Sequence, residues 1–169
     1  IFKPIVAAAA LDKELSRPQD VYFCENGKLK IGNATIGEAS SHKFGWLTMN
    51  DIIAKSSNIG VVKIAQQVGK KSFYEYIRKF GFGEKSGLSL PGESAGQLKA
   101  QQNWSNLSLA SISFGHEIAV TPIQMVSALS AIANGGNLME PHIIKELIKN
   151  GKVVQQFKPK KIHRVISEK

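Results

Sequence analysis

The chain has 169 residues, of which 43% are hydrophobic, and this composition is sufficient for one modest domain with a buried core. Its 22 Lys and Arg against 13 Asp and Glu give a formal net charge of +9, which raises nucleic acid or an anionic surface as a partner. The basic residues are scattered, however, and the densest cluster, Lys158–Arg164, lacks the interleaved aromatic residues of a single-strand binder. We therefore expect no nucleic-acid partner.

Signals for a membrane span, a disulfide or a metal site are weak. The longest apolar runs, such as Ile5–Leu11, are too short to cross a bilayer, so any membrane anchor is expected outside this sequence. The first residue is Ile within a helical pattern rather than Met, which indicates a piece of a longer protein. The single Cys24 has no second cysteine to pair with, and the histidines lie at no ligand spacing, so no metal is expected.

Helical patterns dominate the first half of the chain. Residues 1–14 form the first predicted helix, because Ala7–Ala10 have the highest helix propensity and Pro4 falls in the first turn. Residues 16–44 carry Pro, Gly and Asn between short β-prone runs, so an irregular segment with short strands is expected. Apolar residues at helical spacing predict three more helices: from the N-cap Thr48 to about residue 57, over 59–68, and over 72–80.

The second half begins with turns and ends with strands. Gly and Pro keep residues 81–96 out of helices, and helices are expected again over 104–113 and 121–134. Apolar runs on both sides of Asn150–Gly151 predict two strands joined by a two-residue hairpin turn. No clear element is expected over 160–169. The prediction is an α+β chain with a helical portion over roughly residues 1–140 and a β-hairpin over 141–157.

Two short segments combine an amine or hydroxyl side chain with a local sequence that could bury or turn it. Lys3 lies in the first predicted helical turn beside Phe2 and Ile5, and burial there disfavours the ammonium form and lowers the pKa of the amine. About fifty residues later, Ser56 and Asn58 are separated by one serine. Residues two apart do not share a helix face, so these side chains can face one cleft only where the backbone leaves the helix. On its own, Ser-Ser-Asn is equally a common cap or turn sequence.

Seven segments together resemble one family. Besides Ile1–Pro4 and Lys55–Gly60, five segments follow in the family's order and spacing: Gly81–Gly83, Leu90–Glu93, Ile112–Gly115, Val120–Gln124 and Ala133–Gly136. The chain thus resembles the transpeptidase domain of class B penicillin-binding proteins, and is closest to the division-type subgroup. The resemblance implies the largely helical part of the β-lactamase/transpeptidase-like (penicillin-binding) fold, with a C-terminal β-hairpin from an incomplete sheet, so that residues 1–169 are a partial transpeptidase domain.

The resemblance also implies roles for individual residues. In this family a nucleophilic serine stands three positions before a lysine, in the pattern Ser-x-Phe-Lys-Pro. Lys3 matches that lysine as the general base, which implies a nucleophilic serine directly before Ile1. In the second motif, Ser-x-Asn, Ser56 is implied to relay a proton to the leaving amine and Asn58 to bind the peptide amide of the substrate.

The family's third motif, Lys-Thr/Ser-Gly, is expected beyond Lys169. Lys85–Gly87 has the same pattern, but it falls where the family has a surface turn, so Lys85 is expected to have no catalytic role. His116 and Glu117 are adjacent on an expected loop and stand where many relatives carry Gln-Gly. Adjacent loop residues usually point apart, so a solvated pair is expected rather than an acid-base pair.

The function that the resemblance implies is that of a peptidoglycan D,D-transpeptidase. Such an enzyme cross-links stem peptides that end in D-Ala-D-Ala, is acylated by β-lactams, needs no cofactor and works on the outer face of the cytoplasmic membrane, where divisome or elongasome membrane proteins are potential partners. The 169 residues alone are expected to be inactive without the serine and the third motif. Two alternatives stay open: a D,D-carboxypeptidase or serine β-lactamase relative, and a non-catalytic β-lactam sensor or division scaffold.

Overall fold

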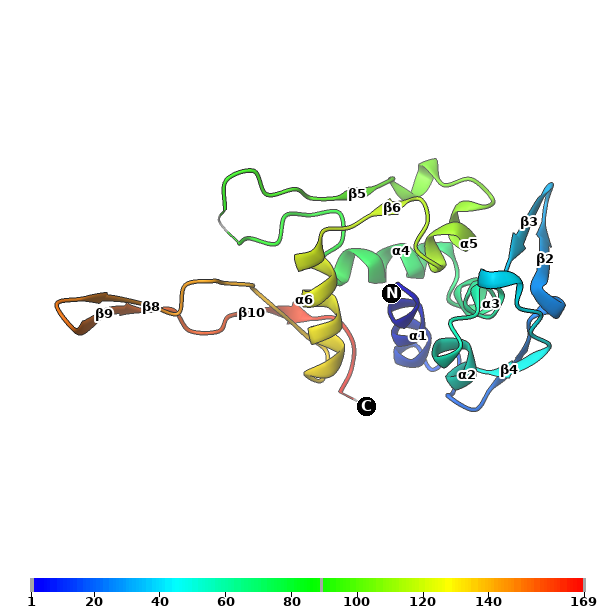
Figure 1. Ribbon diagram of the computed structural model, residues 1–169, viewed down its shortest axis with the longest axis horizontal. Coiled ribbons are helices and arrows are strands. Elements are labelled where there is room, and N and C mark those ends of the chain that lie inside the picture. The colour runs from blue at the N-terminus through cyan, green and yellow to red at the C-terminus, as the bar shows by residue number, and fades with distance from the viewer. Residues whose placement is uncertain (1, 89, 169) are drawn as a thin grey trace. The chain divides into compact units, whose positions relative to one another are not determined.

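The computed structural model describes residues 2–88 and 90–168 (Figure 1). The chain forms two compact units, one of Ile1–Ile77 with Gln97–Ala119 and one of Arg78–Gly96 with Val120–Lys169. These units are defined by contacts rather than by element type. Both units contain helices and strands, so they do not test the expected division into a helical portion over 1–140 and a hairpin portion over 141–157, which stays a prediction.

Helix α1 (Lys3–Asp12) is the most buried helix among the described residues of the first unit. Ile5, Val6, Ala9 and Ala10 are fully buried, as expected for a helix that is apolar on all sides. Pro4 is tolerated because the first helical turn has backbone N–H groups without intrahelical partners. The predicted helix over residues 1–14 is thus shorter in the structure, and Ile1 lies outside the described residues.

Four further helices lie in or begin in this unit: α2 (Met49–Ala54), α3 (Asn58–Val68), α4 (Lys70–Lys79) and α5 (Ser108–Ser113). Helix α1 packs against α2 and α3, and α3 packs against α5 (Figure 1). Thr48 and Asp51 form a reciprocal capping box at the start of α2, as the N-cap prediction for Thr48 requires. Gly60 allows α2 and α3 to approach closely, because a Cβ there would lie 2.4 Å from the Ile52 side chain.

Helix α5 begins later than the sequence predicts. A helix was expected over residues 104–113, but the Ser105 backbone N–H donates to the Ser108 hydroxyl at 3.0 Å, and this local bond replaces a helical turn. Trp104 is instead buried against the rings of Phe73 and Tyr74, and its indole N–H donates to the Lys99 carbonyl at 3.0 Å.

Short antiparallel strand pairs complete the first unit. The pairs are β1 (Val21–Phe23) with β4 (Trp46–Thr48), β2 (Lys28–Ile31) with β3 (Ala34–Gly37), and β5 (Gln97–Leu98) with β6 (Ile118–Ala119). Single 3-10 turns lie at Glu25–Gly27, Ala39–Ser41 and Gln101–Asn103. The expected irregular segment over 16–44 therefore contains strand β1 and the whole β2–β3 pair, and the end of β3 leads to Glu38.

The second unit is built on helix α6 (Pro122–Ala133), which has Pro122 in its first turn and a capping box between Thr121 and Gln124. Strand β7 (Asn137–Met139) packs on α6 and pairs antiparallel with β10 (Lys161–Arg164). The prediction of no element over 160–169 was wrong. All four residues of β10 are exposed, so its hydrophobic pattern gave no signal, and pairing with the distant β7 defines the strand instead.

Strands β8 (Glu146–Lys149) and β9 (Lys152–Gln156) form the expected hairpin. Asn150 and Gly151 make the two-residue turn and both have positive φ angles, 53° and 72°. This is the backbone that a type I′ turn requires, which explains the choice of Asn-Gly.

Candidate active site

Lys3 lies in the first turn of α1 with its side chain turned inward. Only 8% of the residue is exposed, and its neighbours in sequence Phe2 and Ile5 are 3% and 0% exposed. Burial removes water from the amine and lowers the pKa of Lys3 from its ordinary value, while the negative charge of Glu38 opposes the shift. The position therefore favours a neutral amine more than a surface position does.

The amine of Lys3 meets Ser56, which is 53 residues further along the chain. Lys3 Nζ donates to Ser56 Oγ at 2.8 Å and also to the Ser56 backbone carbonyl. A neutral lysine amine is a base as well as a donor, so the contact provides a path for a proton between the two side chains. The structure thus brings together two of the three predicted site residues.

Ser56 is positioned by the way α2 ends. Its φ angle is 57°, in the left-handed region, and the Ser57 N–H donates back to the Ile52 carbonyl at 2.9 Å while the Ser56 N–H donates to the Ile53 carbonyl at 3.3 Å. These bonds are the pattern of a Schellman C-cap, in which glycine is the usual left-handed residue. A serine here keeps an exposed hydroxyl at the end of the helix, at a cost in backbone strain.

The next two residues begin α3. Ser57 is the N-cap, since its hydroxyl accepts from the Gly60 N–H at 2.9 Å, and Asn58 is the first helical residue. The Ser-x-Asn motif therefore spans the junction of two helices, which is the backbone break that the sequence argument required. Asn58 is half-buried, and its Nδ2 donates to the Gly37 carbonyl at 3.0 Å.

Glu38 is a residue of this site that the sequence analysis missed. Its carboxylate accepts from the Ser57 hydroxyl at 2.5 Å and from the Asn58 backbone N–H at 2.5 Å. The available signal was weak: a single acidic residue after a short strand, well before the motif in the sequence. Its importance depends on the path of residues 28–46, which the sequence showed only as irregular.

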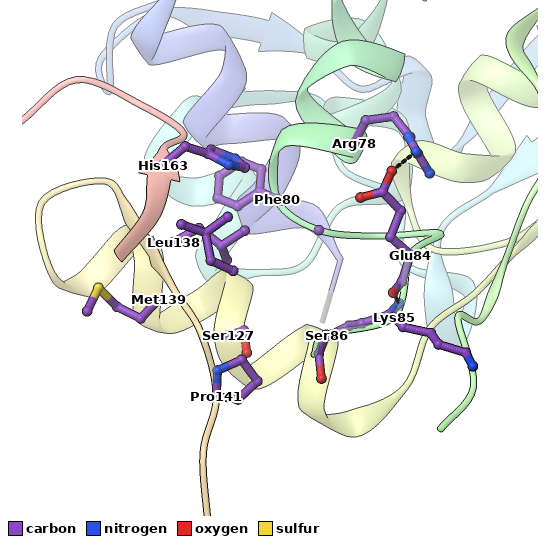
Figure 2. A pocket seen from close by; sticks show the side chains of 13 residues that line it. Arg78, Phe80, Glu84, Lys85, Ser86, Ser127, Leu138, Met139, Pro141 and His163 are labelled. Carbon is purple, nitrogen blue, oxygen red and sulfur yellow. Dashed lines mark hydrogen bonds and ion pairs between the residues drawn. The ribbon is translucent and has the colours of Figure 1, made fainter. Parts of the chain in front are cut away.

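Lys85–Gly87 lies in the second unit, beside a cavity whose walls include Phe80, Leu138 and Pro141 (Figure 2). The Ser86 backbone N–H and hydroxyl both donate to the carboxylate of Glu93. Glu93 therefore holds Ser86 in place, Lys85 and Gly87 are exposed, and the absence of a catalytic role for Lys85 stays a prediction.

The polar groups around this cavity are also used within the protein. Arg78 pairs with Glu84 (Figure 2). Arg78 also donates to the Gly83 carbonyl at 3.2 Å, and the His163 ring nitrogen Nε2 contacts the Lys79 carbonyl at 2.8 Å. The cavity thus offers mostly apolar walls rather than an arrangement of groups for acyl transfer.

His116 and Glu117 have different partners, as expected for adjacent loop residues. Glu117 accepts from the Ser108 hydroxyl at 2.8 Å and pairs with Lys99 at 3.4 Å, whereas the His116 ring contacts the ring of Phe114. Neither is directed at Lys3 by any of these contacts.

Within residues 2–88 and 90–168, no three His, Cys, Asp or Glu side chains cluster in a way that could hold a metal ion. Over the same residues, every helix is too short or too polar to cross a membrane.

Comparisons with known proteins agree on one family. Residues 1–169 match the family described as penicillin binding protein transpeptidase domain. The chain is 37% identical over 166 residues to the penicillin-binding protein PbpB of Mycolicibacterium smegmatis, covering 98% of this chain and 25% of that protein. It is 30% identical over 134 residues to the peptidoglycan D,D-transpeptidase FtsI of Escherichia coli K12, covering 79% of this chain and 22% of that protein.

A solved structure shows the same fold. The crystal structure of penicillin-binding protein 3 from Mycobacterium tuberculosis, complexed with ampicillin, has a TM-score of 0.88 and 34% sequence identity over 99% of this chain and 37% of that chain. The chain therefore belongs to the penicillin-binding protein transpeptidase domain family. The resemblance and the α+β fold expected from the sequence are both confirmed. The chain spans about a quarter of the length of PbpB and of FtsI.

Proposed function

We propose that the chain is part of a peptidoglycan D,D-transpeptidase in which Lys3 is the general base, Ser56 a proton relay and Asn58 a substrate-binding residue. The observation that supports this most directly is the bond of 2.8 Å from the amine of buried Lys3 to the Ser56 hydroxyl. Two names among the comparisons agree with it: FtsI is a peptidoglycan D,D-transpeptidase, and penicillin-binding protein 3 was solved in complex with ampicillin.

The proposed reaction runs through an acyl-enzyme. The hydroxyl of a serine directly preceding Ile1 loses its proton to the neutral amine of Lys3 as its oxygen attacks the carbonyl carbon of the penultimate D-alanine of a stem peptide. The bond to the terminal D-alanine breaks, and the leaving amine takes a proton that Ser56 relays from Lys3. An amine on a neighbouring stem then attacks the ester carbonyl carbon and gives up a proton, the bond to the serine oxygen breaks, and Lys3 returns a proton to that oxygen, so the free serine is restored. Asn58 binds the substrate's peptide amide through its carboxamide.

The proposed function also implies the substrates, the protein partners and the cellular location of the complete protein. The substrates are stem peptides ending in D-Ala-D-Ala, β-lactams acylate the same serine, and divisome or elongasome membrane proteins are the proposed protein partners. The complete protein works on the outer face of the cytoplasmic membrane, where peptidoglycan is cross-linked. The third motif, Lys-Thr/Ser-Gly, is proposed to follow Lys169, and residues 1–169 form a partial domain.

Intact mass after incubation with a penicillin tests this function. A complete transpeptidase domain that contains this sequence should gain one β-lactam adduct, and residues 1–169 alone should gain none. Labelling of the short chain contradicts the assignment of the serine. A complete domain without an adduct favours the scaffold alternative.

Product analysis then separates the enzymatic alternatives. Incubation of the complete domain with a D-Ala-D-Ala stem peptide and an acceptor amine should give a cross-linked product. Release of D-alanine with water as the only acceptor indicates a D,D-carboxypeptidase, and rapid turnover of the penicillin indicates a β-lactamase.

A further inference from the structure

Glu38 is connected to the start of α3 by an unusual concentration of hydrogen bonds. Oε1 accepts from the Ser57 hydroxyl at 2.5 Å and from the Ile59 N–H at 3.4 Å, and Oε2 accepts from the Asn58 N–H at 2.5 Å. The residue stands between the end of β3 and the turn at Ala39–Ser41. Its carboxylate thus joins the β2–β3 hairpin segment to the helix junction.

These bonds satisfy donors that a helix leaves unpaired. The first N–H groups of an α-helix have no intrahelical acceptor, and a carboxylate beside them is also favoured by the helix dipole. Ser57 completes the arrangement, because its hydroxyl donates to Glu38 while it accepts from the Gly60 N–H at 2.9 Å. Ser57 is fully buried, so its side chain has no water to replace a lost partner.

Ser57 and Asn58, which Glu38 holds in this way, are the second and third residues of the Ser-x-Asn motif. Ser56 precedes Ser57 with a left-handed backbone, and Asn58 follows as the first helical residue. A rotation of the Ser57–Asn58 peptide would turn the Ser56 hydroxyl away from Lys3 and the Asn58 side chain away from the Gly37 carbonyl. The same carboxylate acts on Lys3 at a distance, since its negative charge favours the ammonium form and opposes the effect of burial on the pKa of Lys3.

We propose that Glu38 is a positioning residue for the acylation step: its bonds to the Ser57 hydroxyl and the Asn58 N–H hold the backbone between α2 and α3 in the conformation that orients Ser56 and Asn58. This role rests on the function proposed above and assigns to it a residue outside the family's three motifs.

Other charged groups on the elements around Lys3 have partners of their own. Helix α1 also carries Asp12, which accepts from Tyr76 of α4, and Lys13 caps its far end. On α2, Asp51 pairs with Lys55 at 3.4 Å, and on α3, Lys63 pairs with Glu25 at 2.5 Å. Among the described residues, Glu38 is the group whose charge shifts the pKa of Lys3.

Two substitutions at Glu38 separate its two effects. Glu38→Ala removes the hydrogen bonds to the Ser57 hydroxyl and the Asn58 N–H. The second-order rate constant of acylation by a penicillin should then fall by about 10- to 100-fold, as expected when reacting groups are misplaced. Glu38→Gln removes the charge and keeps one of the two oxygen acceptors, while its NH2 group takes the place of the other, which accepts from either the Ser57 hydroxyl or the Asn58 N–H. The pKa of Lys3 should then fall further, so the acidic limb of the pH profile for acylation should move to lower pH.

The measurement is the acylation rate of the complete transpeptidase domain from pH 5 to pH 10, with a fluorescent penicillin, under conditions where each variant is folded. Glu25→Gln is the matched control, because Glu25 is also a paired carboxylate of this unit and its partner is Lys63. Its profile should coincide with that of the wild type.

The outcomes are distinguishable. A role in stability alone predicts a lower melting temperature for Glu38→Ala with an unchanged acylation rate and an unmoved profile for Glu38→Gln, and that pair of results overturns the proposal. A wild-type domain that no penicillin acylates refutes the proposed function instead. Both the proposed function and the role of Glu38 are supported if a penicillin acylates the wild type, Glu38→Ala is acylated more slowly, and the pH profile of Glu38→Gln is shifted to lower pH.

Discussion

The amine of Lys3 lies 2.8 Å from the hydroxyl of Ser56; Lys3 is in the first turn of α1, and Ser56 directly follows Lys55, the C-cap of α2. Neither a lysine nor a serine at these positions would by itself indicate that the two side chains meet. Their meeting depends on a buried α1 and on a left-handed residue at the end of α2, so the contact is a property of the fold.

Substitution of Lys3 by methionine tests its proposed role as the base. Methionine keeps most of the volume and removes the amine, so acylation of the complete domain by a penicillin should slow by about 100- to 10,000-fold, the usual contribution of a general base. Stability should not fall, because the variant buries no ionisable group and exposed Ser56 can hydrogen-bond to water. The control is Lys13→Met, at the exposed end of α1, which should be acylated at the wild-type rate.

The lowered pKa of Lys3 has a consequence for stability. At pH values below the folded-state pKa, lysine is charged in both states and the folded state bears the desolvation cost of the ammonium. As the pH rises from that lowered pKa toward the ordinary value of 10.5, the folded amine loses its proton first. The free energy of unfolding should therefore rise through this window.

Urea unfolding of the wild type and of Lys3→Met at several pH values measures this effect. The difference in unfolding free energy between the two proteins should move in favour of the wild type as the pH increases through this window, whereas acylation should accelerate as the pH approaches the folded-state pKa of Lys3 from below and level off above it. A difference that is constant with pH would mean that the amine has its ordinary pKa in the folded protein.

The backbone of Ser56 makes a different prediction. Alanine and glycine at this position both remove the hydroxyl, and both should slow acylation to a similar extent. Only glycine adopts a φ angle of 57° without a steric cost, so Ser56→Gly should be more stable than Ser56→Ala by about 1 kcal/mol. Thermal unfolding of both variants checks this, and equal stabilities would show that the left-handed conformation carries no strain here.

Elements that depend on short-range signals were predicted from the sequence, and an element that depends on distant pairing was not. Helices α1, α3 and α6 and the β8–β9 hairpin were predicted because short-range signals determine them: alanine-rich or apolar spacing, a Pro in the first turn, and Asn-Gly in a tight turn. Strand β10 was missed because it is exposed and exists through pairing with β7, more than twenty residues away.

The candidate site divides in the same way. Lys3, Ser56 and Asn58 could be selected from the sequence because the order of many segments resembled one family, and their roles stay predictions. Glu38 could not, because its contacts depend on how an irregular segment of short strands folds back onto α3. Local propensity contains no information about that path.

Gln124 offers a test in the second unit, where the sequence segment Val120–Gln124 matched the family. The residue is only 1% exposed, and its Nε2 donates to the carbonyls of Glu84 and Ala95 at 2.7 Å and 2.9 Å. Its Oε1 accepts from the Thr121 N–H at 2.9 Å, which completes the capping box of α6. One side chain thus connects the start of the helix to two points in residues 78–96.

Gln124→Leu should lower the free energy of unfolding of the complete domain by about 3 kcal/mol, since similar volume is kept while two carbonyls and one N–H lose their partner. Thr121→Ala, which removes the hydroxyl that accepts from the Gln124 N–H, should cost only about 1 kcal/mol. Gln124→Glu keeps the acceptor but turns a second oxygen toward the two carbonyls, so it should be destabilising at neutral pH and recover partly in acid, where a protonated carboxyl can donate. If Gln124→Leu and Thr121→Ala lower the free energy of unfolding equally in urea, the contribution of Gln124 to stability comes from the helix cap alone. Its bonds to residues 78–96 would then contribute nothing to stability.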